Sequence, residues 1–348
     1  MRIETITEQA RQYGASDIHL VAGQPPILRR DGQMHRMDFI VSDSELHELI
    51  LSLLPDYLRP AFENGEDADF AYKDADERRY RVNIFRQMGQ LGCVMRLLAA
   101  SIPTLDELSL PAVLKDLVML PRGLVLVTGP TGSGKSTTLA AMIDHANLNR
   151  QSHIITVEDP VEYVHTCKNS IINQREVGRD VQSFSGALRS AMREDPDIIL
   201  VGEMRDFETI SAAITAAETG HLVLSTLHTT GAAKTIDRII DVFPPHQQEQ
   251  IRTQLASVLK GVITQQLVRK IGGGRCAAFE ILIANDAIAN MIREGKTHQI
   301  NSAMQTGLRE GMILLDKNLA ELANQGVIER EEAQRACERP DELRRFLR

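Results

Sequence analysis

Apolar positions in the first third of the chain follow two different spacings. They recur at helical intervals over residues 3–13 and 46–53. Short apolar runs alternate with turn-forming residues in residues 16–35, and further strand-like runs lie within residues 70–98. This mixture of helical and strand-like spacing predicts a small α+β domain over residues 1–100.

A different pattern begins near residue 117, where short continuous apolar runs alternate with helical segments. The runs are GLVLVTG (123–129), HIITVE (153–158), DIILVGE (197–203) and HLVLSTLH (221–228). Such runs are typical of parallel strands whose two faces are both covered by helices. We therefore expect an α/β domain over residues 117–348. Since Pro103 and Pro111 bracket the segment before it, we expect a linker over residues 101–116.

The spacing after Pro245 predicts one long helix that extends to Leu267. Five apolar residues fall on one face of this helix: Ile251, Leu255, Val258, Val262 and Leu267. After the GGG turn, the run FEILI (279–283) predicts one more strand, and the rest of the chain is predicted to be helical.

Composition narrows the class of protein. The 348 residues, 43% hydrophobic and 25% charged, are typical of about two globular domains. The four cysteines are far apart and form no CxxC pair, which predicts reduced thiols and neither a zinc module nor a disulfide framework. The chain has no apolar run of membrane-span length and no signal-peptide pattern, so we expect a cytoplasmic protein whose membrane contact is peripheral. The net charge of −8 argues against nucleic acid as the partner, although a ring could still contain a local basic channel.

The segment GPTGSGKS (129–136) follows an apolar strand and precedes an amphipathic helix, which predicts a phosphate-binding loop. We expect Lys135 to reach the outer phosphates and the Ser136 hydroxyl to be a ligand of Mg²⁺. Nucleotide contacts are expected from nine consecutive residues: Gly129, Pro130, Thr131, Gly132, Ser133, Gly134, Lys135, Ser136 and Thr137.

Acidic residues follow two of the other predicted strands. We favour Glu162, in ITVEDPVE, as the group that orients the attacking water and contacts the metal ion through water. The alternative is that this acidic cluster caps a helix or faces solvent. Glu203, which ends DIILVGE, resembles the acid of a Walker B strand and is expected to hold Mg²⁺ through a coordinated water. Asp197 lies at the other end of that strand, which indicates a structural role.

Two histidines flank the run LVLSTL, and two arginines lie on predicted strands of the first domain. His228 is expected at the same sheet edge as the phosphate loop, where it could sense the γ-phosphate, while His221 begins the run. Strand-end histidines are more often structural. Arg81 and Arg96 would act as arginine fingers if the first domain closed over a nucleotide, and would otherwise be solvated.

Four segments taken together resemble the nucleotide-site motifs of the type II/type IV secretion ATPase superfamily: GPTGSGKS, ITVEDPVE, DIILVGEMRD and HLVLSTLHT. SDIHL (16–20) and the strand arginines resemble the small PAS-like N-terminal domain of that superfamily. The resemblance implies a RecA-like P-loop ATPase domain with a helical C-terminal region, preceded by a PAS-like α+β domain and supplied with ATP and Mg²⁺. It also implies site roles for six residues: Arg81, Arg96, Glu162, Glu203, His221 and His228.

The segment AIANMIREGK (287–296) resembles a motif of the pilus-retraction members, with Ala289 where they usually have arginine. This resemblance implies a homohexameric motor for type IV pilus retraction and twitching motility. It would be peripheral to the cytoplasmic membrane and would act with an inner-membrane platform protein, the pilus base and, where present, a paralogous retraction ATPase, without nucleic acid. The alternatives are a pilus-assembly or type II secretion ATPase, a RecA-like nucleic-acid translocase and a non-catalytic nucleotide-gated scaffold.

Overall fold

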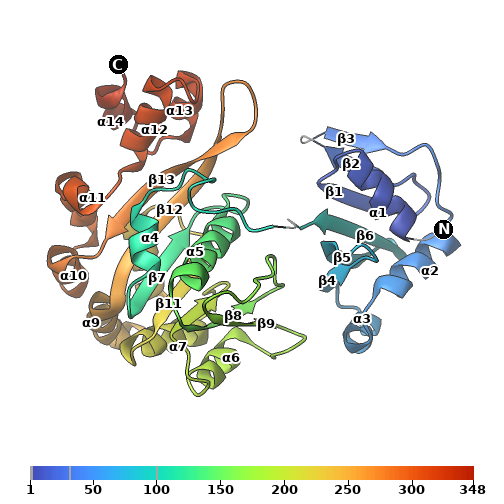
Figure 1. Cartoon of the computed structure of the whole chain (residues 1–348), viewed down its shortest axis with the longest axis horizontal. Coiled ribbons are helices and arrows are strands. Elements are labelled where there is room, and N and C mark those ends of the chain that lie inside the picture. Colours follow the sequence, from blue (N-terminus) through green and yellow to red (C-terminus); the bar gives the residue numbers. More distant parts are fainter. Residues whose placement is uncertain (1–2, 31–32, 99–100) are drawn as a thin grey trace. The chain divides into compact units, whose positions relative to one another are not determined.

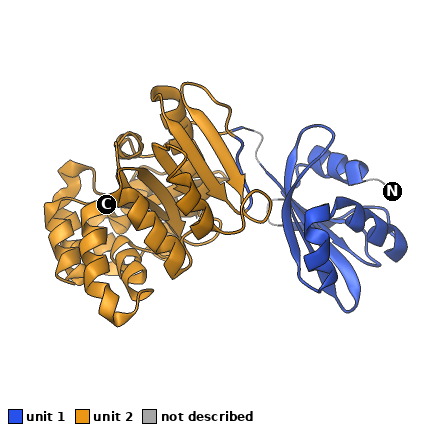
Figure 2. Cartoon of the chain, turned by 90° about the horizontal axis from the view of Figure 1, so that it is seen from below, with its two compact units in different colours: residues 1–101, 160–164 blue, residues 102–159, 165–348 orange. Residues whose placement is uncertain are grey.

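The computed structural model describes residues 3–30, 33–98 and 101–348 (Figure 1). The chain forms two compact units, which Figure 2 distinguishes by colour. Unit 1 contains residues 1–101 and 160–164, and unit 2 contains residues 102–159 and 165–348. The expected domain boundary at residue 100 lies outside the described residues. Most of the expected linker lies in unit 2, where Leu105 and Leu114 are buried.

In the residues that the structure describes, unit 1 is a six-stranded sheet with three α-helices. Its strands have the order β3-β2-β1-β6-β5-β4, and all neighbours are antiparallel. The strands are β1 (Asp17–Val21), β2 (Ile27–Arg30), β3 (Gln33–Arg36), β4 (Ala68–Lys73), β5 (Arg79–Gln87) and β6 (Gln90–Leu97). The helices are α1 (Ile3–Gln12), α2 (Asp43–Leu53) and α3 (Arg59–Glu63). This arrangement agrees with the predicted small α+β domain.

Alternate residues of β5 are buried, and they show which face of this sheet the helices cover. Tyr80, Val82 and Ile84 are buried in one cluster with Ile6 of α1 and Ile50 of α2. Because alternate residues of a strand point to opposite faces, Arg79 and Arg81 of β5 and Arg96 of β6 lie on the other face of the sheet. Arg86 of β5 lies on the covered face, where it donates to the Phe62 oxygen at 2.6 Å.

Unit 2 contains a seven-stranded sheet of order β13-β12-β7-β11-β10-β8-β9, in which only β13 is antiparallel to its neighbour. The strands are β7 (Gly123–Thr128), β8 (His153–Glu158), β9 (Ile171–Glu176), β10 (Ile198–Val201), β11 (Leu222–Leu227), β12 (Leu259–Arg269) and β13 (Arg275–Ile283). Every residue of β7, β10 and β11 is buried, as their continuous apolar runs predict.

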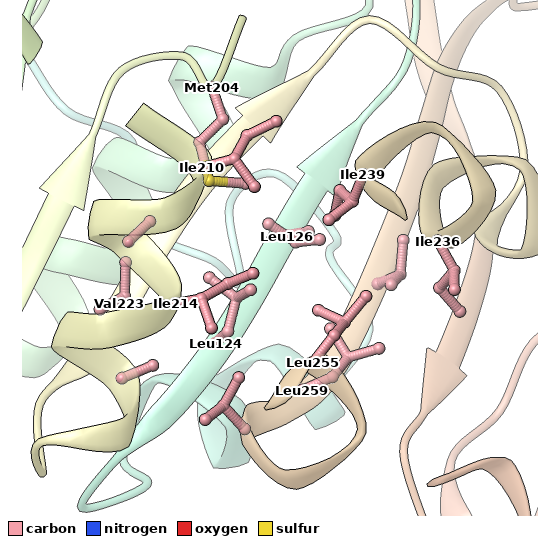
Figure 3. Packing of buried hydrophobic residues seen from close by; sticks show 14 of the residues in the cluster. Leu124, Leu126, Met204, Ile210, Ile214, Val223, Ile236, Ile239, Leu255 and Leu259 are labelled. Atoms are coloured by element: carbon pink, nitrogen blue, oxygen red, sulfur yellow. The ribbon is translucent and has the colours of Figure 1, made fainter. Parts of the chain in front are cut away.

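Helices cover both faces of this sheet. On one face, Leu124 and Leu126 of β7 pack in a cluster with Ile214 of α7 and Leu255 of α9 (Figure 3). On the other face, neighbouring residues of β7 pack against α4 and α5. The helices of unit 2 are α4 (Val113–Val118), α5 (Lys135–Asn149), α6 (Phe184–Ala191), α7 (Phe207–Glu218), α8 (Ala232–Asp241), α9 (Gln248–Val258), α10 (Asp286–Arg293), α11 (Ile300–Thr306), α12 (Leu315–Asn324), α13 (Arg330–Ala336) and α14 (Pro340–Phe346).

The long helix predicted from Pro245 to Leu267 is wrong in its second half. Helix α9 ends at Val258, and the chain continues as strand β12, which pairs with β7 and β13. The apolar residues at 258, 262 and 267 fit a buried strand as well as one face of a helix, so periodicity alone does not separate the two. Pairing on both edges and the β-branched residues Val262, Ile263 and Thr264 favour the strand.

In the ranges that the structure describes, no helix combines the length and the apolar character needed to cross a membrane.

Candidate nucleotide-binding site

Four parallel strands of unit 2 bring the sequence motifs to one edge of the sheet. The loops that follow β7, β8, β10 and β11 all leave from the carboxyl ends of these strands. Backbone hydrogen bonds tie the loops together: Gly202 donates to the Val157 oxygen at 2.8 Å, and Met204 donates to the Thr226 oxygen at 3.1 Å. The edge therefore carries the loop 129–136, Glu158, Glu203 and His228 side by side.

The loop 129–136 has the backbone that phosphate binding requires. Gly129, Gly132 and Gly134 have φ angles of 140°, 78° and 91°, which L side chains rarely adopt. Gly134 is the N-cap of the 15-residue helix α5 and has no side chain with which to cap it. The first-turn N–H groups of α5 are thus directed at the loop, and the Ser136 hydroxyl at this helix end is exposed. These groups fit a polyphosphate with its bound Mg²⁺.

Lys135 lies within the loop. Its Nζ donates to the carbonyl oxygens of Gly129 at 2.8 Å and Pro130 at 3.0 Å, and the residue is buried. The ammonium group is therefore held inside the curve of the loop, where its charge is close to the first turn of α5.

Two of the loop glycines differ sharply in the space around them, and this difference predicts different costs for an alanine substitution. A Cβ at Gly129 would lie 2.2 Å from the Gln265 backbone oxygen, whereas a Cβ at Gly132 would have nothing within 4 Å. We expect Gly129→Ala to lose about 3 kcal/mol of stability through overpacking, and Gly132→Ala to lose about 1 kcal/mol from its left-handed backbone alone. Thermal unfolding of both variants measures this difference, and equal melting temperatures would contradict it.

Glu203 lies between two basic side chains. Its Oε1 is 3.0 Å from Nε2 of His228 and its Oε2 is 2.6 Å from Nη2 of Arg205, while only 17% of the side chain is exposed. Burial, the largest single influence, acts to raise the pKa of Glu203, but the hydrogen bonds and charges of Arg205 and His228 together lower it. Glu203 is therefore an ionised carboxylate at neutral pH.

His228 connects this carboxylate to the phosphate loop. While its Nε2 faces Glu203, its Nδ1 is 3.5 Å from Oγ1 of Thr131. His221, by contrast, lies at the start of β11, where its Nδ1 is 2.8 Å from the Ala216 oxygen. Because β11 spans six residues, about 20 Å of strand separates the two histidines. The structure brings His228, and not His221, to the loop of the same chain.

Glu162, Arg81 and Arg96 belong to unit 1. Arg81 and Arg96 are direct cross-strand partners on β5 and β6, and each pairs with a carboxylate: Arg81 with Asp69 at 2.6 Å and Arg96 with Asp17 at 2.8 Å. Their predicted contact with nucleotide, and the predicted water-orienting role of Glu162, stay predictions.

Arg79, which the sequence analysis did not select, holds the segment of Glu162. Its guanidinium donates to the backbone oxygens of Val161 at 2.7 Å and of Glu162 at 3.4 Å. The sequence feature that could have indicated Arg79 is its position two residues before Arg81, on the same face of the same strand.

Three residues of unit 2 that sequence reasoning also missed support the site. Arg205 pairs with Glu203, and its place two residues after Glu203 in GEMRD was the available signal. Gln265 of β12 contacts both the loop and α5, but the apolar spacing around it predicts a helix in place of this strand. Oε1 of Glu280 accepts the N–H of Ala232 at 2.7 Å, which holds the start of α8 just after His228, and burial raises the pKa of this carboxyl.

The chain is similar to a known protein family and to proteins of known function. The family model of the type II/IV secretion system protein matches residues 69–345. The chain is 51% identical to the type IV pilus retraction ATPase PilT of Pseudomonas aeruginosa over 342 residues, 98% of this chain and 99% of that protein. It is 48% identical to a twitching motility protein of Neisseria gonorrhoeae over 320 residues, 91% of this chain and 86% of that protein.

A solved structure of the pilus retraction motor PilT with bound ADP also matches. Its TM-score is 0.92, its sequence identity is 48%, and the match covers 99% of each chain. The predicted fold class, an α/β P-loop ATPase domain with a small α+β N-terminal domain, is confirmed by this likeness.

Proposed function

Since this chain belongs to the type II/IV secretion system protein family, we propose that it is an ATP-hydrolysing motor that drives the retraction of type IV pili. The observation that carries the proposal is the contact of Thr131 with His228 and of His228 with Glu203. This contact joins a phosphate loop to an ionised acid at one sheet edge, in a chain that matches a retraction ATPase over nearly its whole length.

The loop 129–136 and Thr137 bind the nucleotide in this proposal. Backbone N–H groups at the start of α5 donate to phosphate oxygens, and Lys135 adds its charge at the outer phosphates. When bound, Mg²⁺ would supply positive charge that offsets the negative charge of the outer phosphates. The Ser136 hydroxyl would be its ligand, while Glu203 and Glu162 would hold its coordinated waters.

The acidic and basic side chains of the proposed site have separate roles in hydrolysis. Glu162 orients the attacking water, and His228 senses the outer phosphate while it stays in contact with Glu203. Arg81 and Arg96 neutralise phosphate charge as arginine fingers. His221 has its role proposed from the family resemblance alone, since it lies at the other end of β11.

The assembly proposed for this work is a homohexameric ring that is peripheral to the inner face of the cytoplasmic membrane. It would act on the pilus base through an inner-membrane platform protein, and a paralogous retraction ATPase is a further proposed partner. The near full-length match to a retraction ATPase supports this proposal over a pilus-assembly or type II secretion motor of the same family.

ATP turnover by the purified chain tests the enzymatic part of the proposal. We expect hydrolysis that stops when EDTA removes Mg²⁺, because the proposed ligands act only with the metal ion. We also expect turnover that double-stranded DNA does not stimulate, since the net charge is −8.

Two results would contradict this expectation. Absence of Mg²⁺-dependent turnover would favour a nucleotide-gated scaffold, and DNA stimulation with a steep salt dependence would favour a nucleic-acid translocase.

A further inference from the structure

We propose that Gln265 is a positioning residue that holds the phosphate-binding loop in its binding conformation. The inference rests on the proposed nucleotide-binding function and adds to it a residue from β12, outside the four nucleotide-site motifs. Its side-chain amide makes one hydrogen bond to the loop and one to helix α5, so three elements meet at one group.

The two hydrogen bonds of Gln265 are short and buried. Nε2 donates to the backbone oxygen of Ser133 at 2.8 Å, and Oε1 accepts from Oγ1 of Thr138 at 2.7 Å. Gln265 is 3% exposed and Thr138 is 1% exposed. A backbone carbonyl only accepts, so the amide atom that faces Ser133 must be the nitrogen, and the oxygen must then face Thr138. The contacts fix the orientation of the amide.

Gln265 also leaves no space for a side chain at two of the three glycines of the loop. A Cβ at Gly134 would lie 2.7 Å from Nε2 of Gln265, and a Cβ at Gly129 would lie 2.2 Å from its backbone oxygen. The loop therefore packs directly on β12 at both ends, while Gly132 between them is open. The side chain and the backbone of Gln265 both pack directly against the loop.

The Ser133 carbonyl oxygen accepts the hydrogen bond by which the Gln265 side chain holds the loop. The Ser133 hydroxyl is buried and makes no hydrogen bond to the described part of the chain, so its own side chain does not anchor the loop. Removal of the Gln265 amide would leave the buried Ser133 carbonyl oxygen without this donor, and an unpaired buried polar group is unfavourable. A loop that is held before the nucleotide arrives binds it with less loss of conformational freedom.

The chain contains a matched control one residue away. Gln266 lies on the same strand and points to the opposite face, where its Nε2 donates to the Ala336 oxygen at 2.8 Å. Methionine has nearly the shape of glutamine but no hydrogen-bonding amide. Gln265→Met and Gln266→Met therefore each remove one glutamine amide from β12, and only the first removes contact with the loop.

The experiment measures the dissociation constant of a fluorescent ADP analogue for the full chain, together with the thermal unfolding temperature. We expect Gln265→Met to weaken binding about tenfold or more and Gln266→Met to change it less than about twofold, although both variants lower the unfolding temperature. Equal affinities of the two variants would overturn the inference, because a purely structural glutamine would affect stability alone.

Thr138→Val keeps the inference testable if Gln265→Met does not fold. It removes only the bond to Oε1, so we expect binding to weaken about threefold, and we expect the double variant to be less than additive. Unchanged affinity in Thr138→Val, with Gln265→Met insoluble, would overturn the inference. A wild-type chain that does not bind the analogue would overturn the proposed function as well, whereas wild-type binding with unchanged affinity in Gln265→Met overturns the inference alone.

Discussion

Glutamine in place of Glu203 is expected to lower the ATP turnover number by about 100- to 1,000-fold and to leave ATP affinity within about fivefold. The amide keeps the size of the carboxylate but removes the charge that the ion or its waters would contact, and loss of one such electrostatic group typically costs this factor in turnover. Arg205 and His228 hold this carboxylate ionised, so the charge removed is present at neutral pH.

Steady-state ATPase assays with a parallel binding titration measure this prediction. Glu194→Gln is the control, because Glu194 comes before the amino end of β10 and pairs with Arg175 at 2.9 Å, whereas Glu203 follows the carboxyl end of this strand. We expect Glu194→Gln to keep turnover within about twofold. A Glu203→Gln variant whose turnover stays within about threefold of the wild type would contradict the proposed role.

Alanine in place of Lys135 is expected to weaken nucleotide binding by about 100-fold and to reduce turnover below detection. Two consequences combine in this variant. The phosphates lose a charge-assisted partner, at about 3 kcal/mol, and the loop loses the bonds from Nζ to the Gly129 and Pro130 oxygens that shape it.

The dissociation constant of a fluorescent ADP analogue measures this loss. Lys115→Ala removes a lysine of the same unit that pairs with Asp106 at 2.7 Å, and we expect its affinity to equal that of the wild type. An affinity of Lys135→Ala within about fivefold of the wild type would show that Lys135 does not contact the phosphates.

The parts of the site that local sequence patterns encode could be predicted. The strand, glycine-rich turn and helix around Lys135 are contiguous, and the apolar runs of β10 and β11 end at Glu203 and His228. Because parallel strands place their carboxyl ends at one edge, the sequence alone predicts that these three separate motifs share one site. Their contacts at 3.0 Å and 3.5 Å agree with that prediction.

The parts that depend on distant pairing could not be predicted. Gln265 contacts Ser133 across 132 positions, and the strand that carries it has the apolar spacing of a helix until its pairing with β7 is known. Glu280 holds the start of α8 from 48 positions away. The position of His221 follows from the direction of β11, which places it far from His228 although both belong to one motif.

The most direct test of the central claim counts the pili of living cells and follows their length over time. The cells are those of the native host, with Glu203→Gln as the only copy of the protein. A retraction motor that cannot hydrolyse ATP leaves assembled pili in place, so the account predicts many long pili that never shorten. Loss of surface pili would instead identify an assembly motor, and unchanged pilus dynamics would contradict a role in retraction.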